Sequence, residues 1–209
     1  MLLEKKSVKY LIEVEVKVQI SSPDAMRRKF EENNGIYQLS LIHEDTYFNM
    51  PKGLRNFKQS DEALRLRKSI EFNKENRKET EKNFHYLTYK GKKLDLRTKT
   101  RKEIELKIEN ANKMSEILKE LGFQEIFTIK KQRELYEFTF QNHRIDGLID
   151  YLPILNKYFI EVEMISDSID NLNSYKKIIF RFLNLLGIKE EESIIKSYLE
   201  LILDDFKEL

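Results

Sequence analysis

Acidic side chains recur two residues apart at three places in segments with strand-like alternation, a spacing that could bring pairs of carboxylates together. The pairs are Glu13 with Glu15, Glu103 with Glu105, and Glu161 with Glu163. On a β-strand, residues i and i+2 point to the same face, with their Cα atoms about 6.7 Å apart. Two carboxylates at that separation can share one hydrated divalent ion, and oxygen ligands favour hard ions such as Mg²⁺ or Mn²⁺.

Basic side chains also recur two residues apart, as Arg65 with Arg67 and Lys131 with Arg133. A guanidinium donates forked hydrogen bonds to neighbouring phosphate oxygens. Carboxylates and basic groups facing one cavity would therefore form a metal-assisted polyphosphate site. The alternative is that each set lies on the solvated outer face that antiparallel sheets commonly have. A closed sheet would favour the first interpretation, because it can turn all of these faces inward.

Composition excludes several kinds of site and partner. The chain has no cysteine, which rules out disulfides, thiolate nucleophiles and Cys-based zinc or iron sites. His43, His85 and His143 are too scattered for a His-x-x-x-His zinc helix. The net charge is only +2, so we expect no general binding to nucleic acid or to a membrane surface. Charge begins at Glu4, before an apolar leader could form, and a soluble cytoplasmic protein is expected.

Alternating apolar and polar residues predict strands through the first three quarters of the chain. From Ile12 to Ile20 the even positions are apolar and the odd positions are charged or polar, which gives the strand one face of each kind. Further strands are expected at about 37–48, 63–70, 85–91, 101–109, 125–141, 144–151 and 157–165. Residues 73–83 contain no apolar side chain, so we expect a mobile hairpin loop there.

Helical signals are fewer. Ser22 and Pro23 are typical of a helix start, and Gly122 follows a stretch of helical spacing as a C-terminal cap would. From Ser168 a 3.6-residue period predicts a helix of about 18 residues that stops at Gly187. A second helix is expected at about 190–206, covering the outside of the sheet or forming a dimer face, which leaves a homodimer open.

Many antiparallel strands with a few helices indicate the α+β class, with a barrel or a strongly curved sheet. The length of 209 residues fits one domain, and 40% hydrophobic content is enough to build a core. We therefore expect residues 1–209 to form a single domain, with the sheet at about 10–165 and the C-terminal helices at about 168–207.

In sequence order, the charged segments resemble the motifs of a known family. Glu13-Val14-Glu15-Val16-Lys17 is similar to the Glu-x-Glu-x-Lys signature that opens the CYTH domain of triphosphate tunnel metalloenzymes. Matching segments follow in the family's order at residues 43–48, 61–67, 87–91, 99–105, 131–133 and 159–163. The family includes class IV adenylyl cyclases, thiamine triphosphatases and inorganic triphosphatases, and the resemblance covers about residues 10 to 165.

The resemblance implies an eight-stranded antiparallel β-barrel with helices packed on the outside, whose tunnel holds a triphosphate together with Mg²⁺ or Mn²⁺. By this resemblance the metal ligands are Glu13, Glu15, Glu161 and Glu163. The groups that bind phosphate oxygens are Lys17, Arg65, Arg67, Lys90, Arg101, Lys131 and Arg133. Catalytic roles are implied for Lys17, Glu103, Glu105 and Asp150.

Three functions stay open at this point. The favoured one is a divalent-metal-dependent triphosphatase acting on inorganic triphosphate or a small organic triphosphate. The first alternative is a class IV adenylyl cyclase, which converts ATP to cyclic AMP and pyrophosphate, and the second is a non-catalytic binder of phosphate-rich ligands. In cyclase-like members a Gly-Leu-Gly turn follows the position of Asp150, whereas residues 151–159 here contain no glycine and are one residue longer. This departure argues against a copied nucleoside pocket and favours hydrolysis.

Overall fold

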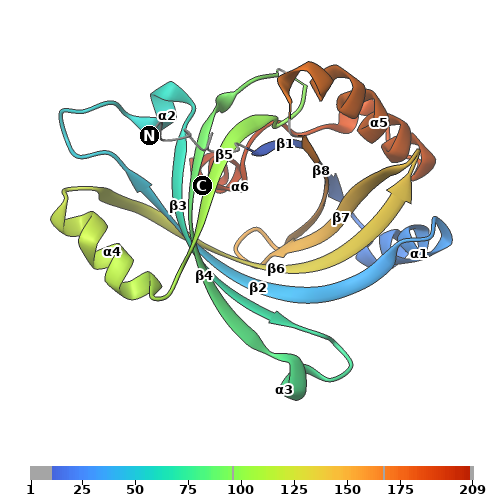
Figure 1. Ribbon diagram of the computed structural model, residues 1–209, viewed down its shortest axis with the longest axis horizontal. Coiled ribbons are helices and arrows are strands. Elements are labelled where there is room, and N and C mark those ends of the chain that lie inside the picture. The colour runs from blue at the N-terminus through green and yellow to red at the C-terminus, as the bar shows by residue number, and fades with distance from the viewer. Residues whose placement is uncertain (1–10, 96, 167, 208–209) are drawn as a thin grey trace, which may run out of the picture.

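The alternating segments form strands that close into a barrel in the computed structural model, which describes residues 11–95, 97–166 and 168–207. Within these residues eight antiparallel strands lie in the order β1-β5-β4-β3-β2-β6-β7-β8, and β1 closes the barrel by pairing with both β5 and β8 (Figure 1). Their bounds are β1 Leu11–Ile20, β2 Ile36–Asn49, β3 Ala63–Phe72, β4 Lys82–Lys93, β5 Arg101–Ile108, β6 Gln124–Phe140, β7 His143–Leu152 and β8 Lys157–Ser166. The expected fold class and the eight-stranded barrel are confirmed.

The longer helices lie around this barrel. They are α1 Pro23–Glu32, α4 Ala111–Glu120, α5 Leu172–Leu185 and α6 Tyr198–Asp205, and two single turns are α2 Phe57–Ser60 and α3 Arg77–Thr80. The helix start predicted at Ser22 is confirmed, because its hydroxyl accepts a hydrogen bond from the Ala25 amide at 3.2 Å. Helices α1 and α5 lie on one side of the barrel and α4 on the opposite side (Figure 1). Among the described residues, no helix is both long and apolar enough to cross a membrane.

The main hydrophobic core lies between the barrel wall and the helices. Val14, Val16 and Val18 of β1 are at most 2% exposed, and they belong to one cluster with Phe30 of α1 and Ile179 of α5. Because successive side chains of a strand point to opposite faces, the charged residues between these valines point into the barrel. The packing of the helices thus determines which face of each strand lines the lumen.

Two segments differ from the sequence prediction. The loop expected at residues 73–83 contains the short helix α3, and β4 begins at Lys82. The helix expected at 190–206 is instead a 3₁₀ turn at Glu190–Glu192 followed by α6, which begins only at Tyr198.

Local hydrogen bonds explain the late start of α6. The Ile194 amide donates to the carbonyl oxygen of Lys17 at 2.8 Å, which ties the segment to β1. Ser197 and Glu200 then form a capping box, in which each side chain accepts a hydrogen bond from the other residue's backbone amide. Tyr198, in the first turn of this helix, faces the lumen residues described below.

Candidate active site

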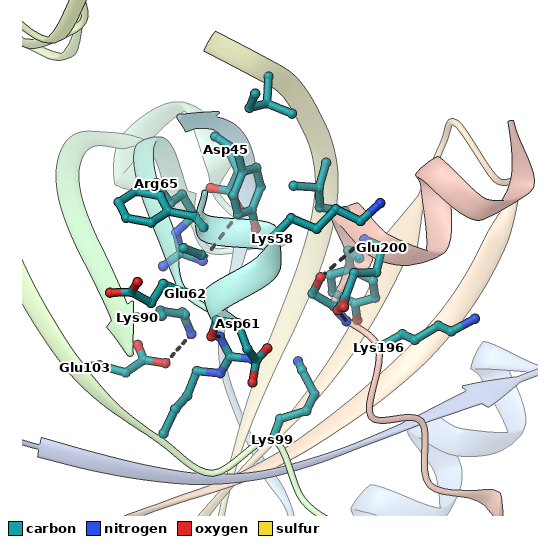
Figure 2. Close-up of a pocket in the computed structure, with 18 of the residues that line it drawn as sticks. Asp45, Lys58, Asp61, Glu62, Arg65, Lys90, Lys99, Glu103, Lys196 and Glu200 are labelled. Atoms are coloured by element: carbon teal, nitrogen blue, oxygen red, sulfur yellow. Dashed lines mark hydrogen bonds and ion pairs between the residues drawn. The ribbon is translucent and has the colours of Figure 1, made fainter. Parts of the chain in front are cut away.

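A cavity of about 700 Å³ occupies the barrel, and its walls carry most of the predicted site residues. Those that line it are Glu13, Glu15, Arg65, Arg67, Lys90, Arg101, Glu103, Glu105, Lys131, Arg133, Glu161 and Glu163. Figure 2 shows acidic and basic side chains from different strands converging on this space, among them Asp45, Arg65, Lys90 and Glu103. The solvated-face alternative therefore does not apply to these residues.

Three of the four predicted metal ligands meet at one point. Each of Glu13, Glu15 and Glu163 offers one carboxylate oxygen, and these atoms all lie within 4.8 Å of one another. Glu15 and Glu163 stand directly opposite each other on the paired strands β1 and β8. Burial and the neighbouring carboxylates raise the pKa of both Glu15 and Glu163, so the cluster favours a cation or a proton. Three clustered carboxylates fit a hard divalent ion.

The fourth predicted ligand, Glu161, has a different environment. Its carboxylate lies 3.3 Å from Lys17 and 3.1 Å from Lys99, and it also accepts a hydrogen bond from Arg133. Burial alone would raise the pKa of Glu161, but the lysine and arginine charges outweigh that effect and hold it well below its ordinary value. Glu161 is thus not one of the three clustered carboxylates and has cationic partners, while its charge also helps to raise the pKa of Glu15.

The predicted arginines are held by carboxylates of the same tunnel. Arg67 donates to both oxygens of Asp45, at 2.6 and 2.8 Å, and Arg65 lies 3.7 Å from the same carboxylate. Arg101 lies 3.3 Å from Asp61, a residue in the left-handed conformation at the end of α2. These contacts orient the guanidinium groups toward the cavity before any anion is present.

Lys90 connects two of the acidic residues. Its ammonium group lies 3.2 Å from Glu13 and forms an ion pair with Glu103, drawn as a dashed line in Figure 2. Burial and the nearby charge of Glu13 raise the pKa of Glu103 to about 8. Glu103 is thus able to hold a proton near neutral pH, beside the acidic group. Glu105, further along β5, is more exposed and accepts a hydrogen bond from the Thr88 hydroxyl at 2.9 Å.

Two predicted catalytic residues lie behind the cavity wall. Asp150 is fully buried and accepts two hydrogen bonds from Arg133, both at 2.6 Å, as well as one from Lys131 at 3.4 Å. Lys17 is also fully buried, and burial together with the charge of Lys99 lowers its pKa to about 7. Neither Lys17 nor Asp150 lines the cavity, and each contacts side chains that do.

Sequence reasoning missed several residues of this site. Lys99, in the loop before β5, forms ion pairs with Glu15 and Glu161. Asp45 pairs with Arg65 and Arg67. Tyr198 donates a hydrogen bond to Asp150 at 2.7 Å. Asp45 could have been identified because it alternates with His43 and Tyr47 on one strand face, and the Ser197 to Glu200 capping box was a readable signal for α6. Lys99 lies in a loop with no periodicity.

Comparison with known proteins agrees with this geometry. The sequence model of the CYTH domain matches residues 11–198. A protein of Methanocaldococcus jannaschii named “Putative adenylate cyclase MJ0240” is 37% identical over 195 residues, which cover 91% of this chain and 98% of that protein. The PH1819 protein of Pyrococcus horikoshii has a similar structure, with a TM-score of 0.78 and 34% identity over 92% of this chain and 99% of that one. The PH1012 protein of the same organism is also similar in structure, with a TM-score of 0.69 and 27% sequence identity. The match covers 91% of this chain and 99% of that one.

The resemblance stated from the motifs is confirmed by the family match over most of the length. A barrel lumen lined by carboxylates and basic side chains, together with this match, shows that the chain belongs to the CYTH domain family.

Proposed function

We propose that this protein is a divalent-metal-dependent triphosphatase that hydrolyses inorganic triphosphate or a small organic triphosphate. The observation that carries the proposal is the placement of an acidic cluster and a set of arginines and lysines in one enclosed cavity. Carboxylates suited to a cation lie beside basic groups suited to a polyanion. A metal–triphosphate complex contains a cation for the carboxylates and a polyanion for the basic groups.

The acidic cluster is the proposed metal site. Glu13, Glu15 and Glu163 would hold Mg²⁺ or Mn²⁺, because carboxylate oxygens are the ligands that these ions prefer. A bound divalent ion would supply charge neutralisation for the phosphate oxygens. Glu161, which was predicted as a ligand, would instead orient Lys99 and Arg133 toward the anion.

The basic side chains would bind and align the triphosphate. They are Arg65, Arg67, Lys90, Arg101, Lys131 and Arg133, with Lys99 added by the structure. Lys17, which was also predicted to bind phosphate, lies behind the wall and would act through Glu161. Holding the triphosphate in a fixed orientation for in-line attack by water reduces the entropy that must be lost to reach the transition state. Glu103 and Glu105 face the cavity and would accept or return a proton. Asp150 would position Arg133 and Lys131 without touching the substrate.

A class IV adenylyl cyclase is the second candidate, favoured by the name of the Methanocaldococcus jannaschii relative. The departure seen in the sequence after Asp150 does not decide against it. Residues 153–156 form the hairpin turn between β7 and β8, and they are not among the described residues that line the cavity. Because both activities would use the same charged tunnel, the triphosphatase and the cyclase are distinguished by the products that form.

Product analysis separates the two candidates. We expect kcat/KM for orthophosphate release from inorganic triphosphate to exceed kcat/KM for cyclic AMP formation from ATP by at least about a hundredfold, or roughly 2.7 kcal/mol. The reason is that hydrolysis needs only the phosphates to be held beside the metal, whereas cyclisation also needs the adenine and the ribose to be oriented. Each substrate is incubated with Mg²⁺ or Mn²⁺, and orthophosphate, pyrophosphate and cyclic AMP are quantified. If cyclic AMP forms faster, the cyclase replaces the triphosphatase.

A further inference from the structure

The aromatic ring of Tyr198 lies among three lysines of the tunnel. The distance from the ring centroid to the ammonium nitrogen is 3.6 Å for Lys17, 5.2 Å for Lys131 and 5.9 Å for Lys99. All three fall within the range of about 6 Å in which an aromatic face attracts a cation. The lysines belong to β1, to β6 and to the loop before β5, so one side chain of α6 contacts three separate parts of the barrel.

The hydroxyl group of Tyr198 makes a second connection. It donates a hydrogen bond to Asp150 at 2.7 Å, and Asp150 accepts both of its short hydrogen bonds from Arg133. Burial and the charge of Asp150 raise the pKa of Tyr198 well above its ordinary value, which keeps the hydroxyl protonated as a donor. The ring thus touches the lysines while the hydroxyl helps to fix the carboxylate that orients Arg133.

The segment before α6 holds Tyr198 in this position. The Lys17 ammonium donates to the carbonyl oxygen of Lys196 at 3.2 Å, and the Ile194 amide donates to the carbonyl oxygen of Lys17 at 2.8 Å. On the other side, the Tyr198 ring packs edge-on against Phe159, with centroids 5.3 Å apart. The chain is therefore fixed to β1 immediately before the tyrosine.

A ring and a carboxylate hold a lysine with different consequences. A carboxylate neutralises the ammonium charge, whereas an aromatic face attracts it and leaves the positive charge in place. The three lysines repel one another, and a lysine side chain has many rotamers to lose when it is fixed. Each of these lysines also has a carboxylate partner, Glu161 for Lys17 and Lys99 and Asp150 for Lys131. The buried ring attracts the ammonium groups further without neutralising more of their charge.

We propose that Tyr198 is a positioning residue that fixes Lys17 behind the cavity wall and orients Lys131 and Lys99, which line the cavity, toward the triphosphate, so that the C-terminal helix forms part of the active site. The inference rests on the proposed function for the identity of the anion. It extends that function by giving a role in the site to a helix that the sequence suggested was a cover for the barrel or a dimer face.

The test compares two substitutions of the same residue, with inorganic triphosphate as the probe. Tyr198→Leu removes the ring, and we expect it to raise the dissociation constant measured by calorimetry, and KM, by at least about tenfold. Tyr198→Phe keeps the ring, and we expect its dissociation constant to stay within about threefold of the wild-type value. The loss should appear in KM, with kcat changed by less than about threefold, because the lysines bind the anion in the ground state as well.

Ile202→Ala provides the matched control. Ile202 is fully buried in the same cluster on the same helix, so its truncation loosens the packing of α6 without touching the lysines. We expect a lower melting temperature but triphosphate binding within about threefold of wild type. Equal weakening by Ile202→Ala and Tyr198→Leu would show that the tyrosine only holds the helix, and unchanged binding in Tyr198→Leu would overturn the proposal directly.

Failure of the proposed role of Tyr198 can be distinguished from failure of the proposed triphosphatase function. If the wild-type protein binds triphosphate but releases no orthophosphate, the triphosphatase proposal fails while the binding comparison still decides the role of Tyr198. If the wild-type protein binds no triphosphate, both proposals are wrong.

Discussion

Glutamates of the same tunnel differ in the direction in which their pKa values are shifted, because their neighbours differ. Glu15 and Glu163 face other carboxylates. Burial and these negative charges raise their pKa values more than the nearby cationic side chains lower them. Glu161, on the same strand as Glu163, is surrounded by ammonium and guanidinium groups that lower its pKa. We therefore propose separate roles for the two members of one Glu-x-Glu pair: Glu161 would orient cationic side chains of the protein, and Glu163 would contribute to the proposed metal site.

A neutral isostere tests this assignment. Glu163→Gln keeps the shape of the side chain and removes one charged ligand, so we expect kcat/KM for triphosphate hydrolysis to fall by at least about tenfold, equal to about 1.4 kcal/mol. Glu44→Gln is the control, because Glu44 lies on the outer face of β2 and pairs with Lys68 at 3.0 Å and Lys130 at 3.4 Å. Equal rates for both variants would remove Glu163 from the site.

The outer face of strand β7 packs against the hydrophobic core, and this packing fixes the position of one wall of the tunnel. Gly147 faces the core between the barrel and the helices, and a Cβ atom built there would lie 2.6 Å from the ring of Phe138 and 3.1 Å from that of Phe30. Both rings are buried in the core cluster, with exposures of 2% and 0%. Glycine allows these aromatic residues to approach the strand that carries Asp150 on its opposite face.

Gly147→Ala should therefore destabilise the fold. We expect a loss of about 1–3 kcal/mol in the free energy of unfolding, because the added methyl group overpacks a close-packed core. Gly91→Ala is the control, since the nearest atom to its Cβ position is 3.5 Å away, and we expect a change within about 0.5 kcal/mol. Denaturant unfolding measures both, and a Gly147→Ala protein as stable as wild type would contradict the packing argument.

The strands were the most predictable elements because a period of two determines both the strand and its inner face. The same alternation placed the Arg65 and Arg67 pair and the Glu-x-Glu pairs correctly on lumen-facing sides. Residues in loops and helix ends have no such pattern, which is why Lys99 and Tyr198 were missed. Pairing between distant strands also could not be predicted in detail, so the cationic partners of Glu161 emerged only from the structure.

For the whole molecule, the closed barrel concentrates charges of both signs in its interior while the net charge of the chain is only +2. Buried like charges destabilise a fold unless each is compensated. Ion pairs within the tunnel provide part of that compensation, and a bound metal and polyanion would provide more. Folding and ligand binding should therefore be linked.

Inorganic triphosphate with Mg²⁺ should raise the melting temperature far more than orthophosphate does. At a concentration one hundred times its dissociation constant, a ligand that binds only the folded state adds about 2.7 kcal/mol of stability. Thermal unfolding at matched ionic strength measures the difference between the two anions. Similar shifts with both would indicate general screening of charge rather than binding in the tunnel.

The most direct test of the central claim is the metal dependence of triphosphate hydrolysis. Orthophosphate release from inorganic triphosphate is measured with Mg²⁺ or Mn²⁺, then in excess EDTA, and again after either ion is restored. We predict that activity is lost in EDTA and returns with the ion, because the three clustered carboxylates need a cation to bind the polyanion beside them. Full turnover in EDTA, or no orthophosphate with either ion, would contradict the account.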